Sequence, residues 1–332
     1  MTQASKERYA EFCGKTYVPV FSRPWWMDAV CGPDGWDVWL YDSGGETFAA
    51  MPYYLEEREH GLYITKPPLT QNNGLIFRYP ANSTPISRQK QEEKAINAAC
   101  EHVASMGLAV YEQQFHHSFG NWSPFYWNGY EALPRYTYVI ADTSDLERVE
   151  ANISRGHRKN IRKGSRNGEV SCDLGAGEFY REHEKIFARQ GLPCPFSEDL
   201  WERLFQACSA NGAGRVLCAR TAAGEVASLM FLVWDDRAAY PLLGGSMPEH
   251  RTLETYSMLT WESIRVAHEK GLAYDFEGSM IERIAKSFRE YGGTPELYFR
   301  IRKVYSPEVV RMEAERKIAL LESRAGGGAV SA

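Results

Sequence analysis

The 332-residue sequence has little of what marks a secreted or membrane-spanning protein. Its N-terminus, MTQASKERYAEF, contains no apolar run of the signal-peptide kind, and no stretch reaches the roughly 18 consecutive apolar residues of a membrane span. The seven cysteines form no CxxC pair, and their scatter is typical of reduced thiols. We therefore expect a cytoplasmic protein that is neither secreted nor integral to a membrane.

Basic charge is also scarce, because 38 Lys and Arg stand against 43 Asp and Glu, a formal net charge of -5. General affinity for nucleic-acid backbones needs a basic surface, so any anion site must be local. Neither a Walker loop nor a nucleophile elbow is present. The adjacent His116 and His117 have no third ligand at metal spacing, so we expect no metal site and interpret this pair as structural.

What is present is the length and composition of a two-domain globular protein. With 44% apolar and 24% charged residues, each half can build its own core. In the first half, periodicity and turn residues predict a mixed α/β unit. Its expected elements are a helix over 23–31, strands over 36–41, 48–54 and 62–66, a helix over 86–106, and strands over 108–115 and 136–140.

The second half repeats this pattern of elements more clearly. We expect a helix over 145–166, a strand over 169–174, helices over 176–190 and 197–210, strands over 215–221, 226–234 and 238–244, a helix over 253–270, a strand over 272–276, a helix over 281–291 and a strand over 298–304. This order is that of the acetyltransferase (GNAT-like) fold. We therefore expect two GNAT-like domains, residues 1–140 and 141–305, followed by a helix and a disordered tail over 306–332.

The strongest local feature is a run of basic residues without an intervening acid between Glu150 and Glu169. At spacings of three and four, these residues gather on one broad face of the expected helix. Such a run is often only a solvated face, but those faces usually mix signs, so we favour binding of phosphate or another polyanion. The residues are Arg155, Arg158, Lys159, Arg162, Lys163 and Arg166.

A second feature is the segment YDFEGSM at the end of an expected buried strand. Asp275 and Glu277 alternate, so along an extended chain both would face one cleft. Ser279 followed by Glu282 reads as a capping box, which explains the serine without catalysis. The capping box does not explain the two acids, one of which we interpret as a base or an amine-positioning group. The polar loop over 68–74 could contact an acceptor, although turn chemistry alone accounts for it.

These segments carry a family resemblance. The run ISRGHRKNIRKGSRNGEV, and YDFEGSM followed by IAKSFREYGG, resemble motifs of Fem-type (FemABX-like) aminoacyltransferases and related GNAT-fold acetyltransferases, over about residues 20–305. The resemblance implies an α/β protein with tandem GNAT-like domains and no metal. It implies transfer of an acyl or aminoacyl group from an acyl-CoA thioester or an aminoacyl-tRNA. The acceptor would be an amine of a cell-envelope precursor, such as an amino sugar, a nucleotide-linked sugar or a lipid-linked or peptidoglycan peptide.

The resemblance also suggests roles for particular residues. Backbone amides at Leu243, Gly244 and Gly245 would stabilise the oxyanion, and the basic helix would face phosphates of donor or acceptor. Two departures leave the donor open. Residues 246–252 lack the glycine-rich pyrophosphate loop of CoA-dependent relatives, and Phe288 stands at the lysine position of the Fem closing motif, where Arg289 or Lys286 could substitute. The alternative is a non-catalytic GNAT scaffold that binds a nucleotide or polyanion. The sequence leaves the oligomeric state open.

Overall fold

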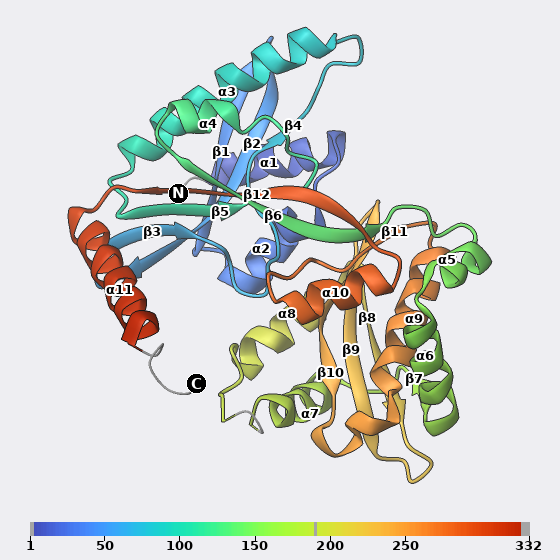
Figure 1. The fold of residues 1–332 in the computed structure, drawn as a ribbon. Helices are drawn as coiled ribbons and strands as arrows, with labels where there is room; N and C mark the ends of the chain where they lie inside the picture. Colours follow the sequence, from blue (N-terminus) through green and yellow to red (C-terminus); the bar gives the residue numbers. More distant parts are fainter. Residues whose placement is uncertain (1–2, 189–190, 327–332) are drawn as a thin grey trace.

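The computed structural model describes residues 3–188 and 191–326, and a single mixed sheet runs through them (Figure 1). Its strand order is β1-β2-β3-β5-β12-β6-β11-β10-β9-β8-β7, with β4 paired to β2. The strands are β1 (Trp36–Ser43), β2 (Glu46–Arg58), β3 (Gly61–Thr65), β4 (Ile76–Phe77), β5 (Val110–Gln114), β6 (Glu131–Ile140), β7 (Glu169–Ser171), β8 (Gly214–Arg220), β9 (Val226–Trp234), β10 (Ala238–Ser246), β11 (Ala273–Asp275) and β12 (Thr294–Val304).

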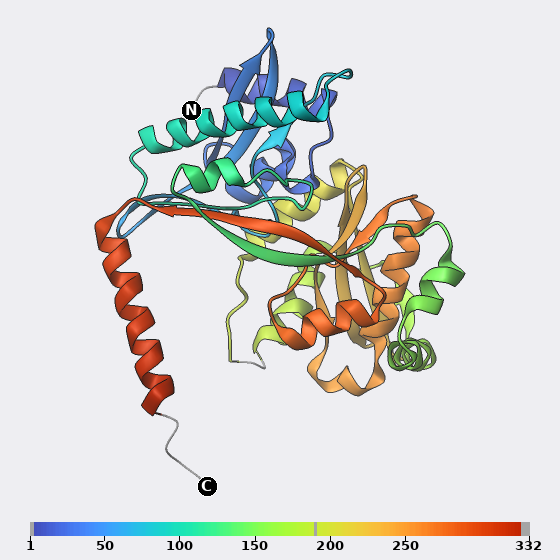
Figure 2. The ribbon, with the colours of Figure 1, turned by 45° about the horizontal axis from the view of Figure 1, so that its top comes forward.

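Helices cover both faces of this sheet (Figure 2). The α-helices are α1 (Gln3–Lys15), α2 (Pro24–Cys31), α3 (Pro85–Ser105), α4 (Ser123–Trp127), α5 (Leu146–Asn152), α6 (Arg155–Asn167), α7 (Ala176–Ala188), α8 (Glu198–Ala210), α9 (Thr255–Glu269), α10 (Glu282–Glu290) and α11 (Pro307–Gly326). Short 3-10 helices, η1 (Val20–Ser22) and η2 (Pro248–Leu253), precede α2 and α9.

The cores follow from apolar faces that the sequence places at helical and strand spacing. In the N-terminal half, α3 buries Ala95, Ile96 and Val103 against β2, β5 and β12, while α1 and α2 cover the opposite face. In the C-terminal half, α7 and α8 pack on one face of β8, β9 and β10, and α9 packs on the other. Helix α2 of the first half joins the core of the second through Trp26. The two halves therefore share buried surface.

The two halves also exchange strands at their junction. Strand β12, the last of the sheet in sequence, pairs with β5 through residues 300–304 and with β6 through residues 294–302. Strand β6 in turn pairs with β11 of the second half at Val139 and Ile140. Figure 1 shows β6 and β12 as a long ribbon across the middle of the molecule. The expected boundary at residue 140 stays a prediction, and the sheet runs across it without a break.

The elements differ from expectation in a few places with clear local causes. The helix expected over 145–166 is two helices, because the Ser154 side chain accepts a hydrogen bond from the His157 amide and starts α6. The capping box predicted at Ser279 is wrong, because α10 begins at Glu282 and Ile281 is its N-cap. The Ser279 hydroxyl accepts a hydrogen bond from the Ile281 amide instead. Helix α1 was not expected.

The C-terminal segment forms α11, as expected, and this helix extends to Gly326. The remainder of the tail expected to be disordered lies outside the described residues. Within residues 3–188 and 191–326, no helix combines the length and apolar character that crossing a bilayer requires.

Candidate active site

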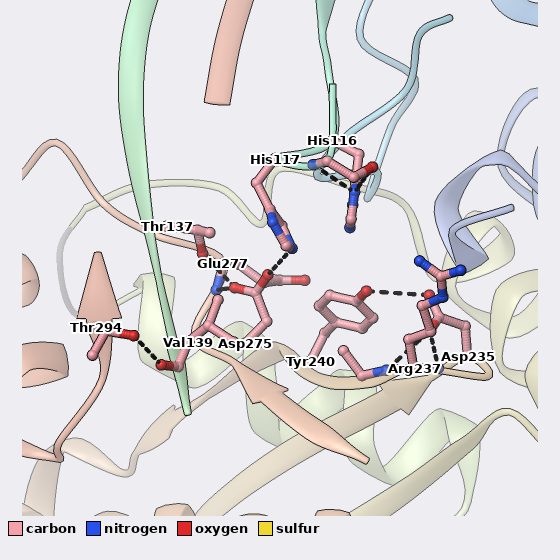
Figure 3. Close-up of polar contacts among 12 residues, drawn as sticks. His116, His117, Thr137, Val139, Asp235, Arg237, Tyr240, Asp275, Glu277 and Thr294 are labelled. Atoms are coloured by element: carbon pink, nitrogen blue, oxygen red, sulfur yellow. Dashed lines mark hydrogen bonds and ion pairs between the residues drawn. The ribbon is translucent and has the colours of Figure 1, made fainter. Parts of the chain in front are cut away.

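Two acidic side chains meet where β11 ends, at the junction of the halves (Figure 3). Asp275 is the last residue of β11, and only 3% of its surface is exposed. Its Oδ1 atom accepts a hydrogen bond from the Thr137 hydroxyl of β6 and a second, of 2.8 Å, from the Glu277 amide. Because β6 pairs with β11, the sheet itself brings Thr137 to this carboxylate.

Glu277 reaches the same place through a turn. Its backbone is left-handed, with φ of 63°, and Gly278 follows with φ of 71°. A Cβ atom on Gly278 would lie 2.2 Å from the Tyr136 carbonyl oxygen, so only glycine fits where the turn presses on β6. The two acids line one cavity, as expected, but the extended chain predicted to place them there is wrong. A left-handed turn is what directs Glu277 inward.

Burial makes the two carboxyls unequal. It raises the pKa of Asp275, although the hydrogen bonds from Thr137 and the Glu277 amide oppose this rise. Burial raises the pKa of Glu277 well above the ordinary value; the negative charge of Asp275 adds to the rise and Lys66 opposes it. The buried Oε1 atom of Glu277 has no hydrogen-bond partner among the described residues. Glu277 is therefore the member of this acid pair that takes up a proton more readily.

The acid pair lines a narrow cavity with a free volume of about 20 Å³, which is room for about one water. Both halves of the chain contribute to it, including two residues of the polar loop 68–74. The lining residues are Gln71, Asn72, Gln114, Phe115, His117, Thr137, Tyr240, Asp275, Glu277 and Tyr298. Sequence reasoning missed Thr137, Gln114, Tyr240 and Tyr298, because only the strand exchange brings these residues together.

The two adjacent histidines have different surroundings. His116 is fixed within its own loop, because its Nδ1 atom accepts a hydrogen bond of 3.2 Å from the Ser118 amide. His117 lines the cavity, and its Nε2 atom lies 4.0 Å from Oδ2 of Asp275. The structural interpretation suits His116 and overlooks the position of His117. In the described part of the chain, no group of three or more His, Cys, Asp or Glu side chains is arranged to hold a metal ion.

Gly244 and Gly245 lie further along β10 than the acid pair. Strand β10 pairs with β11 only at Ala238 and Ala239, so Tyr240 is level with Asp275. At about 3.3 Å per residue, Gly244 lies roughly 13 Å beyond that level. Neither glycine lines the cavity. Along one edge, β10 pairs with β9 up to Ser246. Along the opposite edge, residues 241–246 are not paired with β11.

The basic residues of α6 lie away from the cavity. Arg155, Lys159, Arg162 and Arg166 are exposed, and Arg162 makes a long contact of 3.9 Å with Glu150. Arg158 donates to the carbonyls of Glu150 and Ala151 at the end of α5, and Lys163 is half-buried. Helix α6 crosses α9 so closely that a Cβ on Gly164 would lie 2.5 Å from the Glu254 carbonyl oxygen. At 100° per residue, the exposed Arg155, Lys159, Arg162 and Arg166 lie on the side of α6 opposite Gly164, so the basic face points away from α9.

In the closing motif on α10, Phe288 stands where Fem-type proteins carry lysine, and its side chain packs against the core. Phe288 stacks on Phe276 with ring centroids 4.9 Å apart. Arg289 is exposed, and Lys286, also exposed, lies 3.8 Å from Glu290. None of the three lines the cavity. Helix α10 is held to α6 by His157, whose Nε2 lies 3.0 Å from the Ser287 hydroxyl.

Comparisons with known proteins agree with this fold. Residues 151–283 match the model of the acetyltransferase (GNAT) domain. The crystal structure of FemX is similar over 94% of this chain and 98% of its own, with a TM-score of 0.68 at 12% identity. The C-terminal domain of a putative lysylphosphatidylglycerol synthetase from Agrobacterium fabrum is similar over 96% of this chain and 95% of its own, with a TM-score of 0.55 at 12% identity.

L-PGS from Bacillus licheniformis is similar over 94% of this chain and 96% of its own, with a TM-score of 0.53 at 12% identity. No curated protein matches the sequence. The domain match and the architecture define the chain as an acyltransferase of GNAT fold. Its tandem GNAT-like arrangement is Fem-like, as the sequence motifs predicted.

Proposed function

We propose that this acyltransferase transfers an acyl or aminoacyl group to a primary amine held at the acid pair. The observation that carries the proposal is the buried, unpartnered Oε1 atom of Glu277 beside Asp275 in a cavity that both halves line. Two close, enclosed carboxyls are costly to keep charged, and Lys66 offsets only part of this cost, because the pKa of Glu277 stays well above its ordinary value. A proton or a positive ligand is therefore favoured there. An alkylammonium group supplies that charge.

The reaction follows from this arrangement. The acceptor arrives as an ammonium ion, and the Glu277 carboxylate takes one proton from its nitrogen, which frees the lone pair. The neutral amine attacks the donor carbonyl and a C–N bond forms. The nitrogen of the tetrahedral intermediate then loses its second proton to the departing thiolate or alkoxide as the C–S or C–O bond breaks, while the first proton stays on the acid pair. Asp275 remains hydrogen-bonded to Thr137 and positions the turn that carries Glu277.

The unpaired edge of β10 is our candidate for the donor track. An extended donor arm can hydrogen-bond along residues 241–246, with its carbonyl near Tyr240 and its arm passing Gly244 and Gly245. In this arrangement the oxyanion donors are the backbone amides nearest Tyr240, and Leu243, Gly244 and Gly245 contact the arm instead of the carbonyl. The exposed side of α6 that carries Arg155, Lys159 and Arg162 is our candidate surface for phosphates of the donor beyond this arm.

For the donor we favour aminoacyl-tRNA over acyl-CoA. The start of α9 carries no glycine-rich loop; the 3-10 helix η2 and the left-handed Glu254 occupy it. A carboxylate at a helix N-terminus disfavours a pyrophosphate there. The exposed basic face of α6 instead suits a polyanion. Acyl-CoA is the alternative donor, and the experiment below includes both.

For the acceptor we propose an amine of a cell-envelope precursor, whether amino sugar, nucleotide-linked sugar, or lipid-linked or peptide amine. The C-terminal domain of a putative lysylphosphatidylglycerol synthetase shares this fold, and that protein's name describes an aminoacylated phospholipid as its product. We place the reaction in the cytoplasm, because all seven cysteines are unbridged.

The test is a matrix of donors and amine acceptors. Acetyl-CoA, longer acyl-CoA esters and alanyl-, glycyl- and lysyl-tRNA are each incubated with amino sugars, nucleotide-linked amino sugars and lysine-containing peptides, and acylated amines are detected by mass spectrometry. We expect turnover with a charged tRNA and its loss in Glu277→Gln. Turnover with acyl-CoA alone would overturn the donor assignment. Binding of these ligands without turnover by any pair would support the non-catalytic polyanion-binding alternative.

A further inference from the structure

His117 has a position that a purely structural residue does not need. It lines the cavity beside Asp275 although it comes from the N-terminal half of the chain, and 28% of its side chain is exposed. Its Nε2 atom points at Oδ2 of Asp275 over 4.0 Å, the carboxylate oxygen that accepts neither of the two hydrogen bonds at Oδ1 (Figure 3). The Nε2 edge of the ring thus faces the acid pair, and another part of the ring is exposed to solvent.

We propose that His117 is the proton outlet of the acid pair; this inference rests on the proposed function above. Each turnover leaves on the acid pair the proton that Glu277 removed from the acceptor ammonium. That proton must leave before the next acceptor binds, and the hydrogen-bonded side of Asp275 faces Thr137 inside the sheet. The Oδ2 side faces His117, whose imidazole is the side chain best suited to exchange a proton near neutral pH.

The transfer balances without any further reactant. After it deprotonates the acceptor, the acid pair holds one proton and one remaining negative charge. It gives that proton to Nε2 of neutral His117, and the carboxylates and the imidazolium that result attract each other. Water then takes the proton from the exposed part of the ring. The gap of 4.0 Å is longer than a direct hydrogen bond, and the cavity of about 20 Å³ has room for one bridging water.

The groups around His117 come from several elements. Asp275 lies on β11, Glu277 on the turn after it, Tyr240 on β10 and Tyr298 on β12, and all four line the cavity with His117. The rings of His116 and His117 pack at a tilt with centroids 4.1 Å apart, and the Arg237 guanidinium lies close enough to disfavour a charged His116. Asp275 is thus the acid in contact with His117, and His116 stays neutral because burial lowers its pKa to about 3.

A charged His117 also favours the ionised form of Asp275. Its loss therefore raises the pKa of the acid pair, and the acid limb of kcat/KM moves to higher pH. A merely structural histidine would lower the amount of folded protein but would leave the position of that limb unchanged.

The experiment compares His117→Ala with His116→Gln in the full chain, with the donor and acceptor that turn over in the matrix above. We expect His117→Ala to lose about 10²-fold in kcat at pH 7, with an unchanged melting temperature, and to regain at least tenfold when free imidazole is added. His117→Gln should keep the shape of the side chain without rescuing the rate. The adjacent His116→Gln is the matched control, which imidazole should not accelerate.

The outcomes separate this inference from the proposed function. If Glu277→Gln is inactive while His117→Ala keeps the wild-type rate and pH profile, the outlet is wrong and the proposed function stands. A slow His117→Ala that neither shifts its acid limb nor responds to imidazole also overturns the outlet, because it indicates a packing role. If wild type turns over no donor and acceptor, the proposed function itself fails.

Discussion

The acid pair (Asp275 and Glu277) and the basic helix α6 are both short charged segments, but they differ in their exposure to solvent. Asp275 and Glu277 are enclosed at the junction of the halves, where a sheet neighbour, a left-handed turn and a cavity fix them. The basic residues of α6 lie on an outer surface, and most of their side chains are exposed. Burial therefore shifts the pKa values of the two acids, whereas the exposed side chains of α6 present positive charge to anions in solution.

The largest expected effect is at the acid pair. Glu277→Gln removes the base while it preserves size, so we expect kcat to fall about 10²- to 10⁴-fold in the acyl-transfer assay. Asp275→Asn should lose less, since its role is to position the turn. If both variants fold normally by circular dichroism and keep the wild-type kcat, the acid pair has no part in the chemical step.

The turn that directs Glu277 inward should be intolerant of any side chain. Gly278→Ala places a Cβ 2.2 Å from the Tyr136 carbonyl oxygen and forces alanine into a left-handed backbone. We expect a loss of about 2–4 kcal/mol in the free energy of unfolding, measured by urea titration. Gly224→Ala is the matched control, because it is also left-handed, with φ of 82°, and has open space around it. Equal losses in the two variants would contradict close contact with β6.

The basic helix should affect binding and leave the chemical step unchanged. Charge reversal at Arg155, Lys159 and Arg162 should raise KM for the phosphate-bearing donor about tenfold at 50 mM salt, with kcat within twofold of wild type. The difference should shrink as salt rises, because screening removes the attraction. Reversal of Lys90 and Lys94 on α3 is the control. A fall in kcat at saturating donor would show that α6 takes part in the chemistry.

The smallest effect concerns the contact between α6 and α10. His157→Asn loses the hydrogen bond between Nε2 and the Ser287 hydroxyl and should cost about 1 kcal/mol of unfolding free energy at pH 8. Burial lowers the pKa of His157, so its neutral form stabilises the fold above the unfolded pKa of about 6.5 and this contribution fades as pH falls. The gap between wild type and variant should therefore narrow by pH 5. A constant gap would contradict the burial of a neutral ring.

Periodicity, turn residues and glycine signals predicted most elements, since each depends on neighbours in sequence. The break at Ser154 was missed because a single capping hydrogen bond decided it within a continuous helical pattern. The two acids were found from their place after a buried strand. Thr137 and His117 were not assigned to the site, because they meet Asp275 only through the exchange of β6 and β12, which no local pattern encodes.

The most direct test of the acid pair is the pH dependence of kcat/KM for wild type and Glu277→Gln. Because burial and Asp275 raise the pKa of Glu277, the base is protonated and inactive at low pH. We predict an acid limb with its midpoint well above the ordinary glutamate value of about 4.3, and its absence from the residual activity of Glu277→Gln. A wild-type limb at the ordinary value, or an unchanged limb in the variant, would contradict the account.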